Sequence, residues 1–437
     1  MEIPAGAQIF DLVFHPTFAT VYAGLLTGHI KAFAYDDHGN HESLFTVRPS
    51  KRSCRGLGIN EDGTHLYAVG KGKQLSIIDT KTQSVDTRTQ VHDSPINRVK
   101  CVMRNLISTG DDDGVIKLWD PRKRDCIRTY RQHFDYITDF LWLDDKKQLV
   151  ATSGDGSLSV IDVRSKQEEP VAHSEDQEDE LLSIVAIRSG TKAVVGTQLG
   201  ILSIFNRNKG WGDCVDRVPG HPMSIEALCN IPGNVPNVDS GSTILTGSSD
   251  GYVRAVQLFP TKLLGVVTDH GEWPVERIAV GVGHGQLTIN QNQTIERVIQ
   301  RPREDTDSDR DDDEINAIHG PTWAGSVGHE EILRMSNLDA FFCKERHADR
   351  IDSDGDGEGA LGDIPENEKS ENNSENEPEV DVPGVDSASD QAADSDEPDA
   401  PKAKKRKLKP EKDALKVKKK KKSRNAVEID GAFFNDL

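Results

Sequence analysis

The sequence lacks the features that mark secreted, metal-binding and membrane proteins. Its six cysteines are scattered along the chain: Cys54, Cys101, Cys126, Cys214, Cys229 and Cys343. They form no Cys-x-x-Cys pair and have no regular spacing, which argues against a zinc site and against a disulfide framework. No basic and apolar leader opens the sequence, and no run approaches the roughly 18 apolar residues of a membrane span. We therefore expect a soluble intracellular protein that has no membrane partner.

Several catalytic signatures are also missing. The sequence contains no His-Glu-x-x-His motif, no Gly-x-x-x-x-Gly-Lys-Ser/Thr phosphate loop, and no Rossmann glycine pattern after a predicted strand. The acidic run from Asp352 to Asp363 has the ligand spacing of a calcium loop, but it ends in Asp instead of Glu and has no flanking amphipathic helix. We expect no catalytic residue, no cofactor and no metal, and hence a protein that is not an enzyme.

Charge is distributed very unevenly along the chain. Residues 1–300 carry a net charge of −6, residues 301–400 carry −23, and residues 401–437 carry +9. Only the first segment has enough periodic apolar sequence to bury a core, because the other two lack the apolar residues that offset chain entropy. The composition predicts a folded domain over residues 1–300, an acidic disordered region over 301–400 and a basic disordered tail over 401–437.

A repeated unit organises the first 300 residues. The clearest copy, Leu106 to Asp120, reads as a strand, a tight Asp-Gly turn and a second strand that ends in Trp119-Asp120. Positions equivalent to Asp120 recur at 36, 79, 120, 162, 206, 257 and 300, a spacing close to the roughly 40–45 residues of a four-stranded propeller blade. The one long step contains the loop 232–242, which is rich in Pro, Gly, Asn and Ser. The repeat predicts an all-β, seven-bladed β-propeller.

The repeat resembles that of the WD-repeat family. The resemblance is carried by Trp119-Asp120, by Gly220-His221, and by recurring histidines and turn aspartates: His92, His133, His270, Asp113, Asp155 and Asp250. It implies a buried hydrogen-bonded network, complete in the third blade as His92, Thr109, Asp113 and Trp119. It also implies that a strand from the N-terminus closes blade seven. Because His and Asp recur once per blade, we interpret them as structural groups and not as catalytic pairs.

Partner-binding residues are predicted in two places. Blade-start loops offer arginine and aromatic side chains, the types enriched in binding hot spots, at Arg55, Tyr136 and Trp273. Separately, Asp-x-Arg occurs at the same point of two successive blades, as Asp120 with Arg122 and Asp162 with Arg164. These two pairs resemble the docking box of WD-repeat substrate receptors, which bind the adaptor of a cullin–RING ubiquitin ligase. The alternative is that each Asp simply pairs with its own Arg on the rim of the propeller.

The C-terminal part of the sequence holds short motifs within charged surroundings. An apolar island at residues 332–342 has an echo at residues 427–437, and each either docks on a partner or packs back on the propeller. Dense basic blocks at 401–410 and 416–422 are typical of nuclear import signals and of non-specific RNA contacts. The predicted import signal includes Lys404, Lys405, Arg406 and Lys407. We expect the protein in the nucleus, in particular the nucleolus.

Propeller and tail together resemble one branch of the WD-repeat family. The shared features are the propeller, the acidic stretch, the lysine-rich end and a motif that corresponds to Ser336–Phe342. The resemblance implies a monomeric, non-enzymatic scaffold in ribosomal RNA processing and large ribosomal subunit biogenesis, with ribosome assembly factors as partners. The alternative function is a substrate receptor of a cullin–RING ubiquitin ligase, and a further, weaker alternative is a histone reader.

Overall fold

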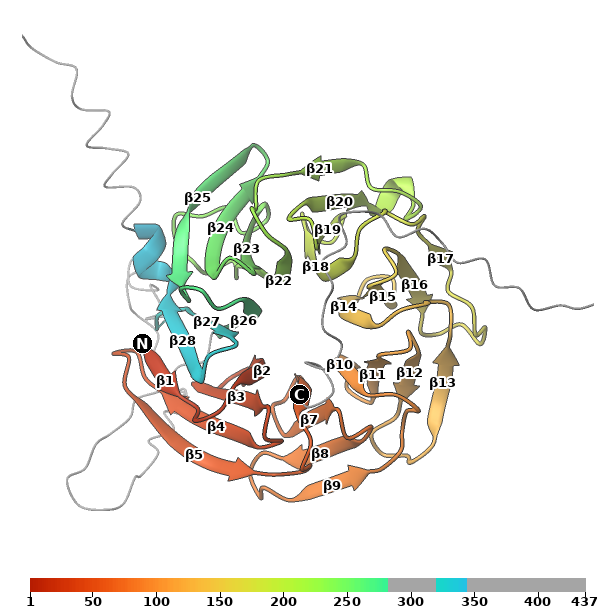
Figure 1. Ribbon diagram of the computed structural model, residues 1–437, viewed down its shortest axis with the longest axis horizontal. Helices are drawn as coiled ribbons and strands as arrows, with labels where there is room; N and C mark the ends of the chain where they lie inside the picture. Colours follow the sequence, from red (N-terminus) through yellow and green to blue (C-terminus); the bar gives the residue numbers. More distant parts are fainter. Residues whose placement is uncertain (282–319, 344–437) are drawn as a thin grey trace, which may run out of the picture. The chain divides into compact units, whose positions relative to one another are not determined.

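The described part of the chain forms a ring of seven sheets. The computed structural model describes residues 1–281 and 320–343. These residues form seven antiparallel sheets of four strands each. The innermost strands of successive sheets contact one another, and the last contacts the first, so the sheets close into a ring (Figure 1). The expected seven-bladed β-propeller is confirmed.

Six blades are each built from one continuous segment, with strands that run in order from the centre of the ring outward. Blade one contains β2 (Ile9–Phe14), β3 (Thr20–Leu25), β4 (Ile30–Tyr35) and β5 (His41–Val47). Blade two contains β6 (Cys54–Ile59), β7 (His65–Gly70), β8 (Leu75–Asp79) and β9 (Val85–Arg88). Blade three contains β10 (Ile96–Met103), β11 (Leu106–Asp111), β12 (Ile116–Trp119) and β13 (Cys126–Tyr130).

The next three blades repeat this order. Blade four contains β14 (Ile137–Leu143), β15 (Gln148–Ser153), β16 (Leu158–Asp162) and β17 (Ala172–His173). Blade five contains β18 (Leu181–Ile187), β19 (Lys192–Thr197), β20 (Leu202–Asn206), the short 3-10 helix η1 (Arg207–Lys209) and β21 (Asp216–Val218). Blade six contains β22 (Ile225–Asn230), β23 (Thr243–Ser248), β24 (Tyr252–Leu258) and β25 (Thr261–Asp269).

The repeat positions read from the sequence mark the third strand in each of these six blades. They fall at the end of that strand, directly after it or inside it: Asp36, Asp79, Asp120, Asp162, Asn206 and Gln257. The long step before Gln257 arises from the loop between β22 and β23, as expected. Hydrophobic clusters bridge neighbouring blades; Tyr130 of blade three, for example, packs in one cluster with Phe140 of blade four. The core therefore lies between the sheets, and each blade depends on its neighbours.

Blade seven is assembled from distant segments. Its strands are β26 (Val275–Gly281), β27 (Trp323–Gly328), β28 (Ile332–Asn337) and, at the outer edge, β1 (Glu2–Pro4). β1 pairs antiparallel with β28, and the fully buried Ile3 lies opposite Leu333. The N-terminal amine of Met1 donates to the carbonyl oxygen of Met335 at 2.9 Å. The expected closing strand from the N-terminus is confirmed.

The predicted end of the folded domain at residue 300 is wrong. Two strands of blade seven lie beyond it, and the third strand of that blade ends at Asn337. The seventh repeat unit predicted up to residue 300 lies outside the described residues. Periodicity failed here because it needs a contiguous blade, whereas residues 282–322 separate β26 from β27. Because the sequence after residue 300 is acidic, we predicted a disordered region there, although β27 and β28 lie within it.

The apolar island at 332–342 belongs to the propeller. Its first half is β28, and residues 338–343 are helical. Leu338 and Phe342 are buried, and both pack in one cluster with Ile231 and Val235 from the loop that follows β22. Of the two expectations for this island, packing against the propeller is confirmed.

Several other expectations concern residues outside the described part of the chain. These are the C-terminal echo at 427–437, the acidic run from Asp352 to Asp363 and the basic blocks, which include Lys404, Lys405, Arg406 and Lys407.

Candidate interaction face

The loops that enter the inner strands and the turns between second and third strands lie at the same end of the ring. Backbone hydrogen bonds join them within a blade: Gly154 N to Tyr136 O (3.0 Å), Gln198 N to Glu180 O (3.1 Å) and Ser249 N to Ser224 O (3.0 Å). Others join a turn to the loop that enters the next blade: Gln177 N to Gly156 O (3.0 Å) and His270 N to Gly251 O (2.8 Å). We call this end the upper face. The opposite end, with the remaining turns, is the lower face.

A buried network anchors the upper-face loop of blade three. His92 lies in the loop before β10, with Nδ1 2.8 Å from Asp111 Oδ2 and Nε2 2.6 Å from Thr109 Oγ1. Trp119 Nε1 donates to the same Thr109 oxygen at 2.8 Å. Burial lowers the pKa of His92 below its ordinary value, although the hydrogen bond to Asp111 opposes this shift. A neutral imidazole thus ties the loop to β11 and β12, because each buried polar group has a partner.

The carboxylate in this network is Asp111, so the prediction of Asp113 was wrong. Asp113 is exposed in the turn, where it accepts a hydrogen bond from the hydroxyl of Ser94. Asp111 is buried at the end of β11 and also accepts from Val115 N at 2.8 Å. Blade three has three consecutive aspartates, and resemblance alone could not tell which one faces the histidine. His92, Thr109 and Trp119 do form the predicted network.

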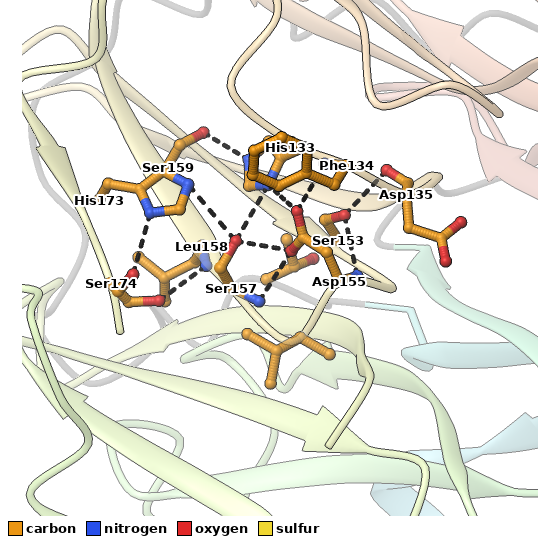
Figure 2. A network of polar contacts seen from close by, with 12 residues as sticks. His133, Phe134, Asp135, Ser153, Asp155, Ser157, Leu158, Ser159, His173 and Ser174 are labelled. Atoms are coloured by element: carbon orange, nitrogen blue, oxygen red, sulfur yellow. Dashed lines mark hydrogen bonds and ion pairs between the residues drawn. The ribbon is translucent and has the colours of Figure 1, made fainter. Parts of the chain in front are cut away.

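Blade four builds the corresponding network with its turn aspartate. His133 Nδ1 lies 3.1 Å from Asp155 Oδ2, and Nε2 lies 2.8 Å from Ser159 Oγ (Figure 2). Asp155 also accepts from Ser157 Oγ at 2.6 Å and from Phe134 N at 2.9 Å. Burial alone would raise the pKa of Asp155, but the hydrogen bonds from His133 and Ser157 outweigh it and hold the pKa well below the ordinary value. The network fixes the exposed Phe134 loop to the turn.

Blades six and seven contain the same histidine–hydroxyl pair. His221 Nε2 lies 2.8 Å from Thr246 Oγ1, and His270 Nε2 lies 2.8 Å from Ser326 Oγ. His270 Nδ1 also lies 2.5 Å from a carboxylate oxygen of Glu330. The hydroxyl lies on the second strand in blades three, six and seven and on the third strand in blade four, where Ser159 supplies it. Because a histidine of the entering loop bonds to a strand hydroxyl in all four blades, we interpret the pair as an anchor of upper-face loops.

One serine stands in a Gly-x-Ser-x-Gly string, Gly247–Gly251. Nucleophilic serines in this pattern occupy a strand-to-helix turn. Ser249 instead lies in the turn between β23 and β24, 2.7 Å from the hydroxyl of Ser224 and 3.2 Å from Glu226 Oε1. The string therefore links a turn to the loop that enters β22.

The three predicted contact residues all lie on the upper face. Arg55 reaches blade three, where it donates to Asn97 Oδ1 at 2.9 Å and pairs with Asp112 at 3.2 Å. Tyr136 donates to Glu180 Oε2 at 2.7 Å and thereby joins blades four and five. The side chain of Trp273, in the loop before β26, is 52% exposed. Arg55 and Tyr136 therefore bridge blades, and the role of all three in partner binding stays a prediction.

Both Asp-x-Arg pairs lie on the lower face, and in each pair the arginine binds the aspartate of the same pair. Arg122 donates to both carboxylate oxygens of Asp120, at 3.0 and 2.9 Å. Arg164 does the same to Asp162, at 3.0 and 2.7 Å. The hydrogen bonds from Arg122 lower the pKa of Asp120 to about 2. This geometry matches the simpler alternative, in which each Asp pairs with its own Arg, and it gives no support to a ligase-docking box.

Sequence reasoning missed a cluster of buried charges at the centre of the ring. Arg277 of β26 lies 3.1 Å from Asp139 of β14, so it bridges blades seven and four across the ring. Arg277 Nε also lies 3.4 Å from Asp11 Oδ1 on β2. Arg98 of β10 donates to the carbonyl oxygen of Thr138 at 2.5 Å. These contacts brace the inner strands against one another.

The charged positions are equivalent, which is the signal that could have revealed them. Each inner strand has a register irregularity just before its third residue. The third residues are, from blade one to blade seven, Asp11, Gly56, Arg98, Asp139, Ser183, Ala227 and Arg277. Two acids and two bases at a position that small residues occupy in the other blades indicate ion pairs at the centre of the ring.

Burial and charge compete in this cluster. Burial alone would raise the pKa of Asp139, but the positive charges of Arg277 and Arg98 outweigh it, so the pKa lies below the ordinary value. At Asp11 burial dominates and the pKa is raised, although Arg277 and Arg98 oppose the shift. Removing one partner of such a pair leaves the other charge buried and unpaired, which typically lowers the free energy of unfolding by about 3–5 kcal/mol.

Two further findings concern only residues 1–281 and 320–343. Within them, no group of three or more histidine, cysteine, aspartate or glutamate side chains could hold a metal ion. Within the same residues, no helix has the length and apolar character needed to cross a membrane.

Comparison with known proteins gives consistent matches over the propeller. A family model described as WDR55 matches residues 1–292. WD repeat-containing protein JIP5 of Laccaria bicolor is 57% identical over 458 residues, which cover 100% of each chain. WD repeat-containing protein 55 of Mus musculus is 34% identical over 298 residues, 68% of this chain and 73% of the mouse protein. WD repeat-containing protein 55 homolog of Dictyostelium discoideum is 35% identical over 274 residues, 62% of this chain and 63% of that protein.

Proposed function

The chain belongs to the WDR55 family, and on this basis we propose that it acts as a monomeric scaffold in ribosomal RNA processing and large ribosomal subunit biogenesis in the nucleolus. Membership of this family and the WD-repeat propeller fold support a role as a protein-interaction scaffold. The finer role rests on one observation, the combination of this propeller with a dense basic block at residues 402–424. Ribosome assembly factors are the proposed partners.

The two parts of the chain would contribute differently to this function. The propeller offers anchored loops, because the histidine networks hold the upper face in place before any partner arrives, which lowers the ordering cost of binding. The basic block carries charges of the kind that nuclear import signals use, among them Lys404 to Lys407. The same charges could contact RNA phosphates without sequence specificity, with affinity that falls as salt rises.

The experiment is to deplete the protein from cells and to measure large-subunit RNA precursors by hybridisation. We expect precursors to accumulate and the wild-type chain to restore processing. A chain that lacks residues 402–424 should fail to restore it, and the same chain with an unrelated nuclear import signal should restore it at least in part. Normal precursor levels after depletion would contradict the proposed function.

A further inference from the structure

Large apolar side chains are exposed on one part of the upper face. They are Phe134, Leu199, Met223 and Trp273, which are 93%, 68%, 53% and 52% exposed. All four stand in loops or turns of blades four to seven, and none of the exposed large hydrophobic residues of the described chain lies on the upper face of blades one to three. Neighbouring segments meet there, because Gly200 of the Leu199 turn packs against the backbone of Met223. Exposed apolar residues gathered on one face mark an interaction surface.

The same part of the upper face is acidic. Its segments span residues 131–136, 174–180, 198–200, 219–226, 269–276 and 329–331, and their only basic residue is Arg131, which lies 3.9 Å from Asp93 of blade three. Their acidic residues are Asp135, Glu175, Asp176, Glu178, Asp179, Glu180, Glu226, Asp269, Glu272, Glu276, Glu330 and Glu331. We call this part the acidic sector. The nearest arginines of blades six and seven, Arg254 and Arg334, are paired with Asp250 and Glu330.

The upper face of blades one and two has the opposite character. Its corresponding segments, 47–55 and 70–74, contain no acidic residue. Their basic residues are Arg48, Lys51, Arg52, Arg55, Lys71 and Lys73. The upper face of blade three is also acidic, with Asp93, Asp112 and Asp113, but it exposes no large apolar side chain, so the exposed apolar side chains coincide with part of the negative surface. The carboxylates concentrate in 174–180, 269–276 and 329–331, so they lie between and beside the exposed apolar side chains of blades four to seven.

We propose that the acidic sector binds an extended segment of a partner protein in which lysine or arginine alternates with large apolar residues. The apolar residues would pack on Trp273, Met223, Leu199 and Phe134, while the cations would meet the carboxylates between them. Such complementarity speeds association and selects against acidic partners. The assignment names a partner class for the proposed scaffold function and rests on that function for the existence of such a partner.

A segment from another protein fits this surface better than the basic block of this chain. The block at 402–424 follows residues 301–400, whose net charge of −23 competes for the same cations. Its unbroken lysine run, Lys418 to Lys422, has no apolar residue, and the large apolar residues of the whole block are Leu408, Leu415 and Val417. A lysine run can satisfy the carboxylates, but it leaves the four apolar side chains uncovered.

The test measures binding of a fluorescent peptide to the full chain by fluorescence anisotropy. The probe alternates Lys or Arg with Leu or Phe over about 14 residues, roughly 45 Å when extended. A second probe replaces each Leu and Phe by Ser. We expect the first probe to bind at least about tenfold more tightly than the second, since the second can use only the charges. Equal affinity of the two probes would overturn the proposal.

Two charge-reversal variants locate the site. Glu175→Lys with Glu272→Lys changes two exposed carboxylates of the acidic sector and should weaken the first probe at least about tenfold at low salt. Glu61→Lys with Asp125→Lys makes the same change in net charge at two exposed positions of the lower face and should weaken it less than about twofold. Equal losses in both variants would show attraction to net charge alone and would overturn the assignment.

A third arm separates a partner segment from the tail of this chain. In a chain that lacks residues 402–424, the affinity for the first probe should stay within about twofold of the full chain. A gain of tenfold or more would show that the tail occupies the sector in the same molecule, and would overturn the assignment to a partner. None of these measurements depends on RNA processing, so the proposed function and this inference can fail separately.

Discussion

Blades three and seven form the same structure from very different stretches of sequence. Each is a four-stranded antiparallel sheet with a buried histidine bonded to a hydroxyl, His92 with Thr109 in one and His270 with Ser326 in the other. In blade three the two partners are 17 residues apart, and in blade seven they are 56 residues apart. Packing tolerates the interruption, but the continuity that makes a repeat visible is lost.

The comparison also separates local from global stability. Blade three forms from one segment, so all four of its strands are adjacent in the sequence, and its core is shared only with blades two and four. Blade seven needs β1 from the N-terminus. Because each blade packs on its neighbours, loss of β1 should also weaken the interfaces of blade seven with blades six and one. A small change at the N-terminus should therefore act far along the sequence. The predictions that follow run from the largest expected effect to the smallest.

The largest effect should come from the core of blade three. Trp119→Ala removes a buried ring and a hydrogen-bond donor to Thr109. The free energy of unfolding should therefore fall by roughly 3 kcal/mol or more. Chemical denaturation measures this change. Trp273→Ala is the matched control, because that ring is half exposed and should cost well under about 1 kcal/mol. Similar losses for the two variants would show that blade three is not packed as described.

The second largest loss of stability should come from the ion pairs around Arg277 at the centre of the ring. Arg277→Met strands the buried Asp139 and should cost about 3 kcal/mol in the same assay. The double variant with Asp139→Asn should cost less than the sum of the two single variants, since neither charge is then left alone. Strict additivity would mean that the two residues do not interact across the ring.

The closing strand offers the direct contrast with blade three. Ile3→Ala truncates a fully buried side chain of β1 and should cost about 2–3 kcal/mol. Ile127→Ala is the control, because Ile127 lies half exposed on β13, the outer strand of blade three, and should change stability by only a few tenths of a kcal/mol. If both changes are equally mild, β1 does not hold blade seven.

A smaller effect should appear on acidification. Burial lowers the pKa of His221 from 6.5 to about 4, with Arg254 as a further cause. Between these values the unfolded chain binds a proton that the folded chain does not, so stability is full above pH 6.5 and declines as pH falls towards 4. We expect Tm to fall over this range, and His221→Asn to reduce the slope. An unchanged slope in that variant would contradict the burial of His221.

The smallest effect should come from the rim. Arg122→Ala with Arg164→Ala removes two exposed guanidinium groups of the lower face, and stability should change by only tenths of a kcal/mol. Large-subunit RNA processing should be normal in cells that carry this double variant. Accumulated precursors together with loss of a co-purified ligase adaptor would restore the docking interpretation of these arginines.

Sequence reasoning found the fold because most blades are contiguous. The third strands near Asp36, Asp79, Asp120, Asp162 and Asn206 follow one period, and the turn chemistry marks each of them. The last two strands of blade seven were not predicted, because the segment between β26 and β27 interrupts the period of the repeat.

The site was predicted less completely than the fold. His92, Thr109 and Trp119 were found from their types and spacing, but the choice between Asp111 and Asp113 depends on side-chain direction at a strand end. The acidic sector and the ion pairs of Arg277 each involve residues from several blades. They can be recognised only once the fold brings these loops and inner strands together.

The most direct test asks whether residues 320–343 complete the ring. A recognition sequence for a specific protease is placed between β26 and β27, near residue 300, and the purified chain is cut there. We expect the two pieces to co-elute in native buffer and to separate in denaturant, because β27 and β28 pair with β26 and β1 of the other piece. Separation of the C-terminal piece in native buffer, with the N-terminal piece still folded, would contradict the seven-bladed ring described here.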